Sequence, residues 1–251
     1  MNTLAPLRPR PAGPLRRAAD VALWLDCRRT SPERARQARA DLAHTVHDML
    51  PPLPRGHSPE RRSADGTVVA GPVHGLAGYR RLMRRLLSRT AASPDSGPVA
   101  RPVAVEYPIP AVDALVNARL DLIGSCEAKA MRFRAGIAGA HLLYDTLRRD
   151  LRSPAWVRAV ARDVPAPYLL WTTEPCAGPD QGAEYAEKCL FPGTAVALSP
   201  DALRTFSRHA VVTGPTAVDL QEARRVAGIL DWFGIRLDAL DGPTARGTTT
   251  R

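Results

Sequence analysis

Lysine is almost absent from this sequence, and its scarcity limits the chemistry that can be expected. Among 251 residues there are two lysines, Lys129 and Lys188. Aromatic residues are also few, at 5%, so the hydrophobic 45% consists mainly of Leu, Val, Ile and Ala. That fraction suffices for a core, and the length allows one large domain, such as an α/β barrel, or two small ones.

Two further absences bear on the cellular setting. No apolar run reaches the roughly 18 residues that a membrane span requires, and the first residues lack the apolar stretch of a secretory signal. Their Arg-rich, acid-free composition would suit a mitochondrial presequence, but four prolines and a glycine disfavour the amphipathic helix it needs. We therefore expect a disordered basic tail over 1–19 in a cytoplasmic protein.

The polar residues show no pattern typical of a metal or cofactor site. Four cysteines form no CxxC pair and no zinc-like spacing, so free thiols in a reducing compartment are expected. His44 and His47 lie three apart on a predicted helix, but no carboxylate or cysteine accompanies them. We interpret them as part of a polar helix face, and we expect neither a metal nor a cofactor.

The net charge of +10 comes from arginines that are spread along the chain. They alternate with apolar positions in predicted helices, which is typical of solvated helix faces. Proteins that recognise nucleic acids usually cluster this charge with aromatics or a known motif. We expect no specific nucleic-acid partner, although polyanions could attract the chain at low salt.

Apolar segments that favour β-structure recur along the chain. We predict strands over 21–25, 67–75 (interrupted by Gly71-Pro72), 102–107, 167–173 and 194–198. Amphipathic or capped segments predict helices over 32–50, 76–89, 111–123, 126–150 and 218–234, with short helices after Ser153-Pro154 and Ser199-Pro200. Thr30 or Ser31 caps the first helix. The alternation predicts parallel β-α units, in which about five strands are too few to close an eight-stranded barrel.

Two Pro-rich segments interrupt this order, and one domain accounts for the rest. Residues 51–66 hold four prolines and two glycines, which indicates a loop and not a strand. A second loose segment covers 90–101, and the stretch from 174 to the strand at 194 is also interpreted as a loop. We expect a single domain over 20–241 and a polar, disordered tail over 242–251.

From residue 111 onward the order of short motifs resembles bacterial transaldolases of the actinobacterial type. The motifs are VDALVNARLDLIG, RAGIAGAHLLYDTL, PYLLWTT, FPGTAVALSPDALRTF and DLQEARRVAGILDWFGIRLDAL. Together they place the resemblance over 102–241. Upstream, VALWLD resembles the opening strand of that family, and GLAGYRRLM resembles the helix after its fifth strand. The interval between these pieces is too short for strands two to four, which indicates a large internal deletion.

This resemblance implies an incomplete (β/α)8 TIM-barrel-like fold of about five strands, rich in helices, with an ancestry in pentose-phosphate carbohydrate metabolism. The family forms a Schiff base on a lysine of strand four, which falls inside the missing interval. Lys129, on a predicted helix, and Lys188, after a predicted loop, are interpreted as ordinary surface residues. Asp26 matches the aspartate that assists proton transfer and is the one catalytic candidate that remains.

Other positions that the family uses for its substrate have also changed. The arginine that grips the phosphate corresponds to Ala111, and the polar pair of strand five corresponds to Val69 and Gly71. In the last strand the polar residues become Ala197 and Leu198. These losses predict a pseudoenzyme that lacks Schiff-base transaldolase activity.

Two alternatives remain open. The chain could be a divergent enzyme that acts on a sugar phosphate in a specialised pathway. It would then recruit side chains near predicted strand ends, such as Asp26, Glu106, Tyr107, Glu174 and Cys176. It could instead serve as a binding partner, because a barrel that lacks strands has open edges that another chain can cover. A homo- or hetero-oligomer and a sugar-phosphate ligand are therefore expected, with no membrane partner.

Overall fold

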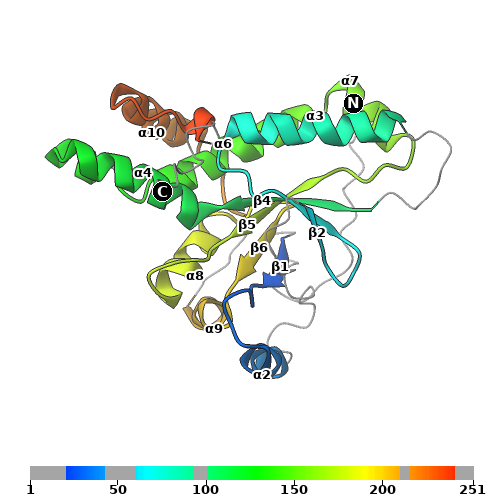
Figure 1. The fold of residues 1–251 in the computed structure, drawn as a ribbon, viewed down its shortest axis with the longest axis horizontal. Helices are drawn as coiled ribbons and strands as arrows, with labels where there is room; N and C mark the ends of the chain where they lie inside the picture. Colours follow the sequence, from blue (N-terminus) through cyan, green and yellow to red (C-terminus); the bar gives the residue numbers. More distant parts are fainter. Residues whose placement is uncertain (1–20, 43–59, 93–100, 210–214, 241–251) are drawn as a thin grey trace, which may run out of the picture.

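The computed structural model describes residues 21–42, 60–92, 101–209 and 215–240 (Figure 1). Within these ranges a single sheet is lined by helices on its convex side. The predicted tails over 1–19 and 242–251 lie outside the described residues, as do His44 and His47. Among the described residues, no helix has the length and apolar character that crossing a membrane requires.

The sheet has six strands in the order β1-β6-β5-β4-β3-β2. Their bounds are Ala22–Leu25 for β1, Glu60–Arg62 for β2, Val68–Ala70 for β3, Val103–Pro108 for β4, Tyr168–Thr172 for β5 and Ala195–Leu198 for β6. All neighbouring pairs are parallel except β2 and β3. Among the described residues, the first strand pairs with the last, as it does in a closed barrel. The fold is therefore an incomplete α/β barrel, as the sequence predicts.

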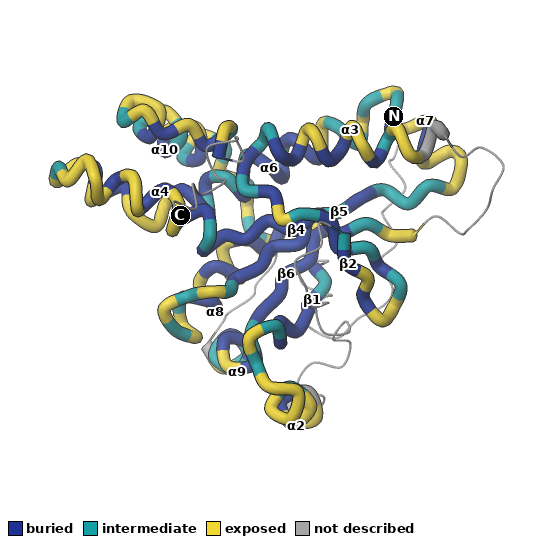
Figure 2. The backbone as a smooth tube through the Cα atoms, in the orientation of Figure 1, coloured by how far each residue is buried: buried dark blue, intermediate teal, exposed yellow. Residues whose placement is uncertain are grey.

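Alternate residues of each strand face opposite sides of the sheet. On the convex side, Leu25, Tyr107 and Trp171 join the large core that the helices complete. On the concave side a second cluster consists only of strand residues: Trp24, Val69, Ala104, Leu170, Ala195 and Ala197. Both faces are buried, and Figure 2 shows the strands in dark blue along most of their length.

Helices cover the convex side in the order that β-α units require. They are α2 (Pro32–Leu42), α3 (Leu76–Ala92), α4 (Ile109–Ile123), α5 (Cys126–Ala130), α6 (Ala135–Asp150), α7 (Pro154–Val160), α8 (Pro179–Glu187), α9 (Pro200–His209) and α10 (Leu220–Trp232), followed by the 3-10 turn η1 (Leu237–Ala239). Their ends follow the local sequence. The Ser31 hydroxyl accepts the Arg34 N–H at 3.3 Å, Asp219 caps α10, and Gly234 has the left-handed φ of +75° expected just past the end of α10.

The prediction of a loop over 51–66 is wrong at its end, where β2 forms. A tight turn brings β2 back against β3, and Asp65 holds it by accepting hydrogen bonds from the Ser63 and Thr67 hydroxyls and from the Thr67 N–H. Gly66 supplies the positive φ that the turn needs. The Asp-Gly pair is a hairpin signal that the prolines upstream outweighed in the sequence interpretation.

The single helix predicted over 126–150 is two helices, α5 and α6. Phe133, between them, has a left-handed φ of 59°, and its N–H donates to the Asn117 side chain at 3.1 Å. The buried Asp113 carboxylate accepts the Gly136 N–H at 2.8 Å and so caps the start of α6. Both acceptors belong to α4, so the break depends on a tertiary contact and has no glycine or proline to announce it.

The stretch after β5, interpreted as a loop, contains the helix α8. Pro179 occupies its first turn, and Ala183, Tyr185 and Ala186 form its buried face. Gly182 lies inside this helix because a Cβ there would come within 2.9 Å of the Ala202 Cβ on α9. The glycine that suggested a loop therefore permits two helices to pack closely.

Candidate functional site

A network of charged side chains lies on the concave face, near the carboxyl ends of the strands. Asp26 follows β1 directly and is 3% exposed. Its two carboxylate oxygens accept hydrogen bonds from the Arg28 guanidinium, with Nε to Oδ1 at 2.9 Å and Nη2 to Oδ2 at 2.6 Å. This bidentate geometry is the strongest form of an arginine–carboxylate pair.

Glu106 of β4 occupies the centre of the network and is 2% exposed. Its Oε1 accepts a hydrogen bond from Nη1 of Arg28 at 2.6 Å, and its Oε2 accepts one from Nη2 of Arg61 in β2. Burial alone would lower the pKa of Arg28, but the hydrogen bonds and charges of Asp26 and Glu106 raise it above its ordinary value. The four charges sum to zero, so the concave face holds its own counterions.

Three buried polar atoms of the described residues have no hydrogen-bond partner, and all belong to this face. They are Trp24 Nε1, Arg61 Nε and Thr172 Oγ1. Trp24 and Thr172 flank Ala197 in the strand register, so a small side chain separates the two polar groups. Buried polar groups are normally paired, and an unpaired one costs about 1–3 kcal/mol. These three groups therefore leave the polar interactions of the concave face incomplete.

The structure brings together two of the residues proposed from the sequence. Asp26 and Glu106 share Arg28, although β6 and β5 separate their strands. Tyr107 faces the opposite, convex side, where its hydroxyl donates to the Gly136 carbonyl at 3.2 Å and its ring meets Trp171 edge-on. Tyr107 therefore lies on the side of the sheet away from the charged network.

Glu174 and Cys176 form a local pair in the loop after β5. The Cys176 N–H and thiol donate to the Glu174 carboxylate at 3.3 and 3.4 Å. Burial, with the negative charge of Glu174, raises the pKa of the thiol to about 11. A thiol held in its protonated form is a poor nucleophile.

Both lysines lie on helices of the convex layer. Lys129 belongs to α5 and is exposed. Lys188 closes α8, is also exposed and forms an ion pair with Glu184 one turn earlier. Neither amine is on the concave face with Asp26.

Sequence reasoning missed Arg28, Arg61, Trp24 and Thr172. Arg28 carried a weak signal, because it follows a buried strand that ends in a carboxylate. Arg61 carried none, since its strand was interpreted as a loop. No three of the histidine, cysteine, aspartate and glutamate side chains in the described ranges are grouped so that they could hold a metal ion.

Comparison with known proteins identifies the relatives of this chain. It is 31% identical over 129 residues to a transaldolase of Frankia alni, a match that covers 51% of this chain and 35% of the relative. A Parafrankia transaldolase is 31% identical over 126 residues, and an Arthrobacter transaldolase is 29% identical over the same length. About half of this chain is therefore similar in sequence to actinobacterial transaldolases. No family model matches it.

The matches span about a third of the length of these transaldolases. These matches confirm the kinship that the ordered motifs predict. The six-stranded sheet confirms the incomplete barrel that this kinship implies.

Proposed function

We propose that this transaldolase-like protein does not carry out Schiff-base aldol chemistry. That reaction requires a partly neutral amine close to the substrate, and burial and nearby charge must lower its pKa. Here the concave face contains two guanidinium groups and two carboxylates that neutralise one another, while both lysines lie exposed on helices. The observation that carries this proposal is that the described concave face has paired charges and no lysine.

The geometry of Asp26 supports the same conclusion. An aspartate that transfers protons must be able to release its partners and meet the substrate. Both oxygens of Asp26 are held by Arg28, which also bridges to Glu106. Moving Asp26 into a proton-transfer role would break this bidentate pair, so its role here is to position Arg28.

Borohydride trapping tests the proposal. The protein is incubated with fructose 6-phosphate and sodium borohydride, and intact mass spectrometry records any reduced adduct. We expect no mass increase under conditions that fully label the Frankia alni transaldolase. An adduct that disappears in Lys129→Arg or Lys188→Arg would show that one of these amines reacts and would refute the proposal.

A second candidate function is binding, or altered chemistry, of a small polar metabolite on the concave face. The three unpaired polar atoms of Trp24, Arg61 and Thr172 favour it, because a ligand with acceptor oxygens would satisfy the two N–H donors. A sugar phosphate carries such oxygens. Its negatively charged phosphate could pair with Arg61 if it displaced the Glu106 carboxylate from that guanidinium.

Thermal unfolding in the presence of sugar phosphates and of inorganic phosphate tests this candidate. We expect a stabilising shift for the wild type that is lost in Thr172→Val. Thr146→Val serves as the matched control, because Thr146 bonds to a carbonyl within α6 on the convex side. No shift with any of these ligands, or an equal loss in both variants, would rule the candidate out. The oligomer expected from the open barrel stays a prediction, which sedimentation of the purified protein can check.

A further inference from the structure

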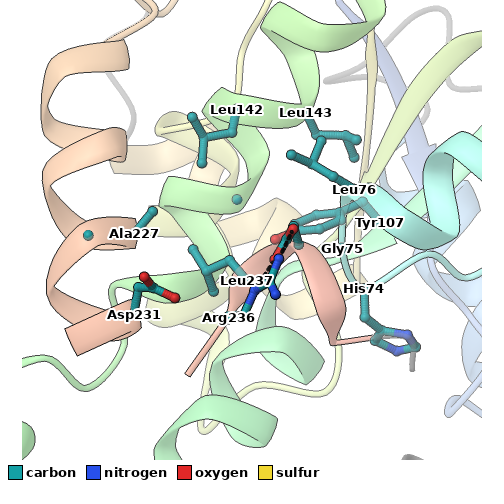
Figure 3. Close-up of a pocket in the computed structure, with 13 residues that line it drawn as sticks. His74, Gly75, Leu76, Tyr107, Leu142, Leu143, Ala227, Asp231, Arg236 and Leu237 are labelled. Atoms are coloured by element: carbon teal, nitrogen blue, oxygen red, sulfur yellow. Dashed lines mark hydrogen bonds and ion pairs between the residues drawn. The ribbon is translucent and has the colours of Figure 1, made fainter. Parts of the chain in front are cut away.

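A cleft with a volume of about 510 Å³ opens on the helical side of the sheet, between α3, α6, α10 and η1 (Figure 3). Its size lies within the roughly 300–1,000 Å³ that is typical of small-molecule sites. It is separate from the charged network, because Tyr107, which contributes to the cleft, faces away from Glu106. Nothing proposed above for the concave face uses this cleft.

The walls of the cleft are largely apolar. Leu142 and Leu143 of α6 lie on one side in Figure 3, and Leu237 lies across from them. Leu76 and Ala227 complete the apolar lining from α3 and α10. Such walls favour a ligand with a hydrocarbon or aromatic body.

Three glycines line the cleft, and two of them, Gly139 and Gly228, differ in what a side chain there would meet. A Cβ at Gly139 would collide with the Tyr107 hydroxyl, so close packing requires glycine there. A Cβ at Gly228 would meet no atom within 4 Å, and its φ lies outside the left-handed region. Glycine destabilises a helix interior. At Gly228, in the middle of α10, neither packing nor backbone geometry accounts for it, and its effect is to keep the wall of the cleft open.

Charge at the mouth of the cleft selects the polar part of the ligand. Arg236 donates to both oxygens of Asp238, at 2.9 and 3.3 Å, so these two charges neutralise one another. Asp231, on the cleft side of α10, forms no ion pair within 4.0 Å in the part of the chain that the structure describes. The two aspartates and the arginine of the lining together carry one net negative charge.

We propose that this cleft binds a small amphipathic amine, with its ammonium group beside Asp231 and its apolar body against Leu142 and Leu143. A carboxylate ligand of the same length would meet Asp231 with like charge, and a neutral alcohol would gain the apolar contact alone. Affinity should therefore rank amine above alcohol above carboxylate, and salt should weaken the binding of the amine.

Titration calorimetry at pH 7.5 with octylammonium, octan-1-ol and octanoate tests this ranking. We expect octylammonium to bind the wild type at least about tenfold more tightly than octanoate. Asp231→Asn should weaken the binding of octylammonium about fivefold and leave octanol unchanged. Asp201→Asn, which removes an exposed aspartate from α9, is the matched control and should change neither.

A second variant tests the cleft itself. Gly228→Leu should fill the open wall and abolish binding of all three probes, while thermal unfolding confirms that the helix stays folded. The proposal is overturned if the wild type binds none of the probes, if octanoate binds as tightly as octylammonium, or if Asp231→Asn has no effect. If Gly228→Leu does not fold, the comparison of Asp231→Asn with Asp201→Asn decides the question.

Discussion

Replacing Glu106 with glutamine should strongly destabilise the protein. The substitution keeps the size of the side chain and removes its charge, so Arg28 and Arg61 lose a common partner. Arg28 retains its hydrogen bonds to Asp26, and 22% of its side chain is exposed. Arg61 has only 8% of its side chain exposed and already leaves its Nε unpaired, so it bears most of the cost.

The magnitude follows from the burial of Arg61. Removing one partner of a buried ion pair costs about 3–5 kcal/mol, because a charge is left uncompensated. The glutamine oxygen can still accept one hydrogen bond, which places the expected loss of unfolding free energy near the lower end, at about 3 kcal/mol. With a urea slope of about 2 kcal/mol per molar, the midpoint should fall by about 1.5 M.

Urea unfolding followed by the fluorescence of the buried Trp24 and Trp171 measures this shift. Glu184→Gln is the control, because it removes an exposed carboxylate that pairs with a surface lysine. It should change stability by less than about 0.5 kcal/mol. The double variant Arg61→Met with Glu106→Leu should recover part of the loss, because no unpaired charge remains.

A loss below about 1 kcal/mol for Glu106→Gln would refute this reasoning. It would mean that water reaches Arg61 and solvates its charge, so the concave face would not depend on the network.

Two further predictions concern the helical layer. Gly139→Ala should lower the free energy of unfolding by about 1–3 kcal/mol, because the new methyl group would collide with the Tyr107 hydroxyl. The same change should cost less in a Tyr107→Phe background, which a double-mutant cycle by urea unfolding would measure. His141 accepts the Asp219 N–H at 3.0 Å, and burial, only partly offset by the charge of Asp219, lowers its pKa from 6.5. Because the unfolded chain then binds a proton more readily than the folded one, the His141 contribution to stability is complete above about pH 6.5 and declines as the pH falls below it. Unfolding free energies measured between pH 5 and 7.5 should therefore depend less on pH in His141→Gln; an unchanged slope would show that another group titrates there.

Local sequence determined most of the elements. Apolar runs gave the five parallel strands because a strand buried on both faces is apolar throughout. Amphipathic spacing and capping residues such as Ser31, Asp219 and Gly234 set the helices, since these interactions lie within a few residues of one another. The order of short motifs along the chain likewise indicated the kinship with transaldolases.

The sequence did not reveal which side of the sheet each strand residue faces. Glu106 and Tyr107 are neighbours, and both are almost fully buried, so burial alone does not distinguish the charged network from the helical cleft. The alternation of side chains sends them to opposite faces, and only the packing of the helices establishes which face is convex. This is why Asp26 and Glu106 meet, while Tyr107 lies elsewhere.

Long-range contacts decided the remainder. The break between α5 and α6 depends on Asn117 and Asp113 of α4, and the closeness of α8 to α9 depends on Gly182. The network itself joins residues separated by up to 78 positions. The sequence therefore determined the helices, the strands and the kinship, because those signals are local. Only the tertiary structure decided which charges share the concave face and where the two lysines lie, because both depend on how the strands and helices are arranged in space.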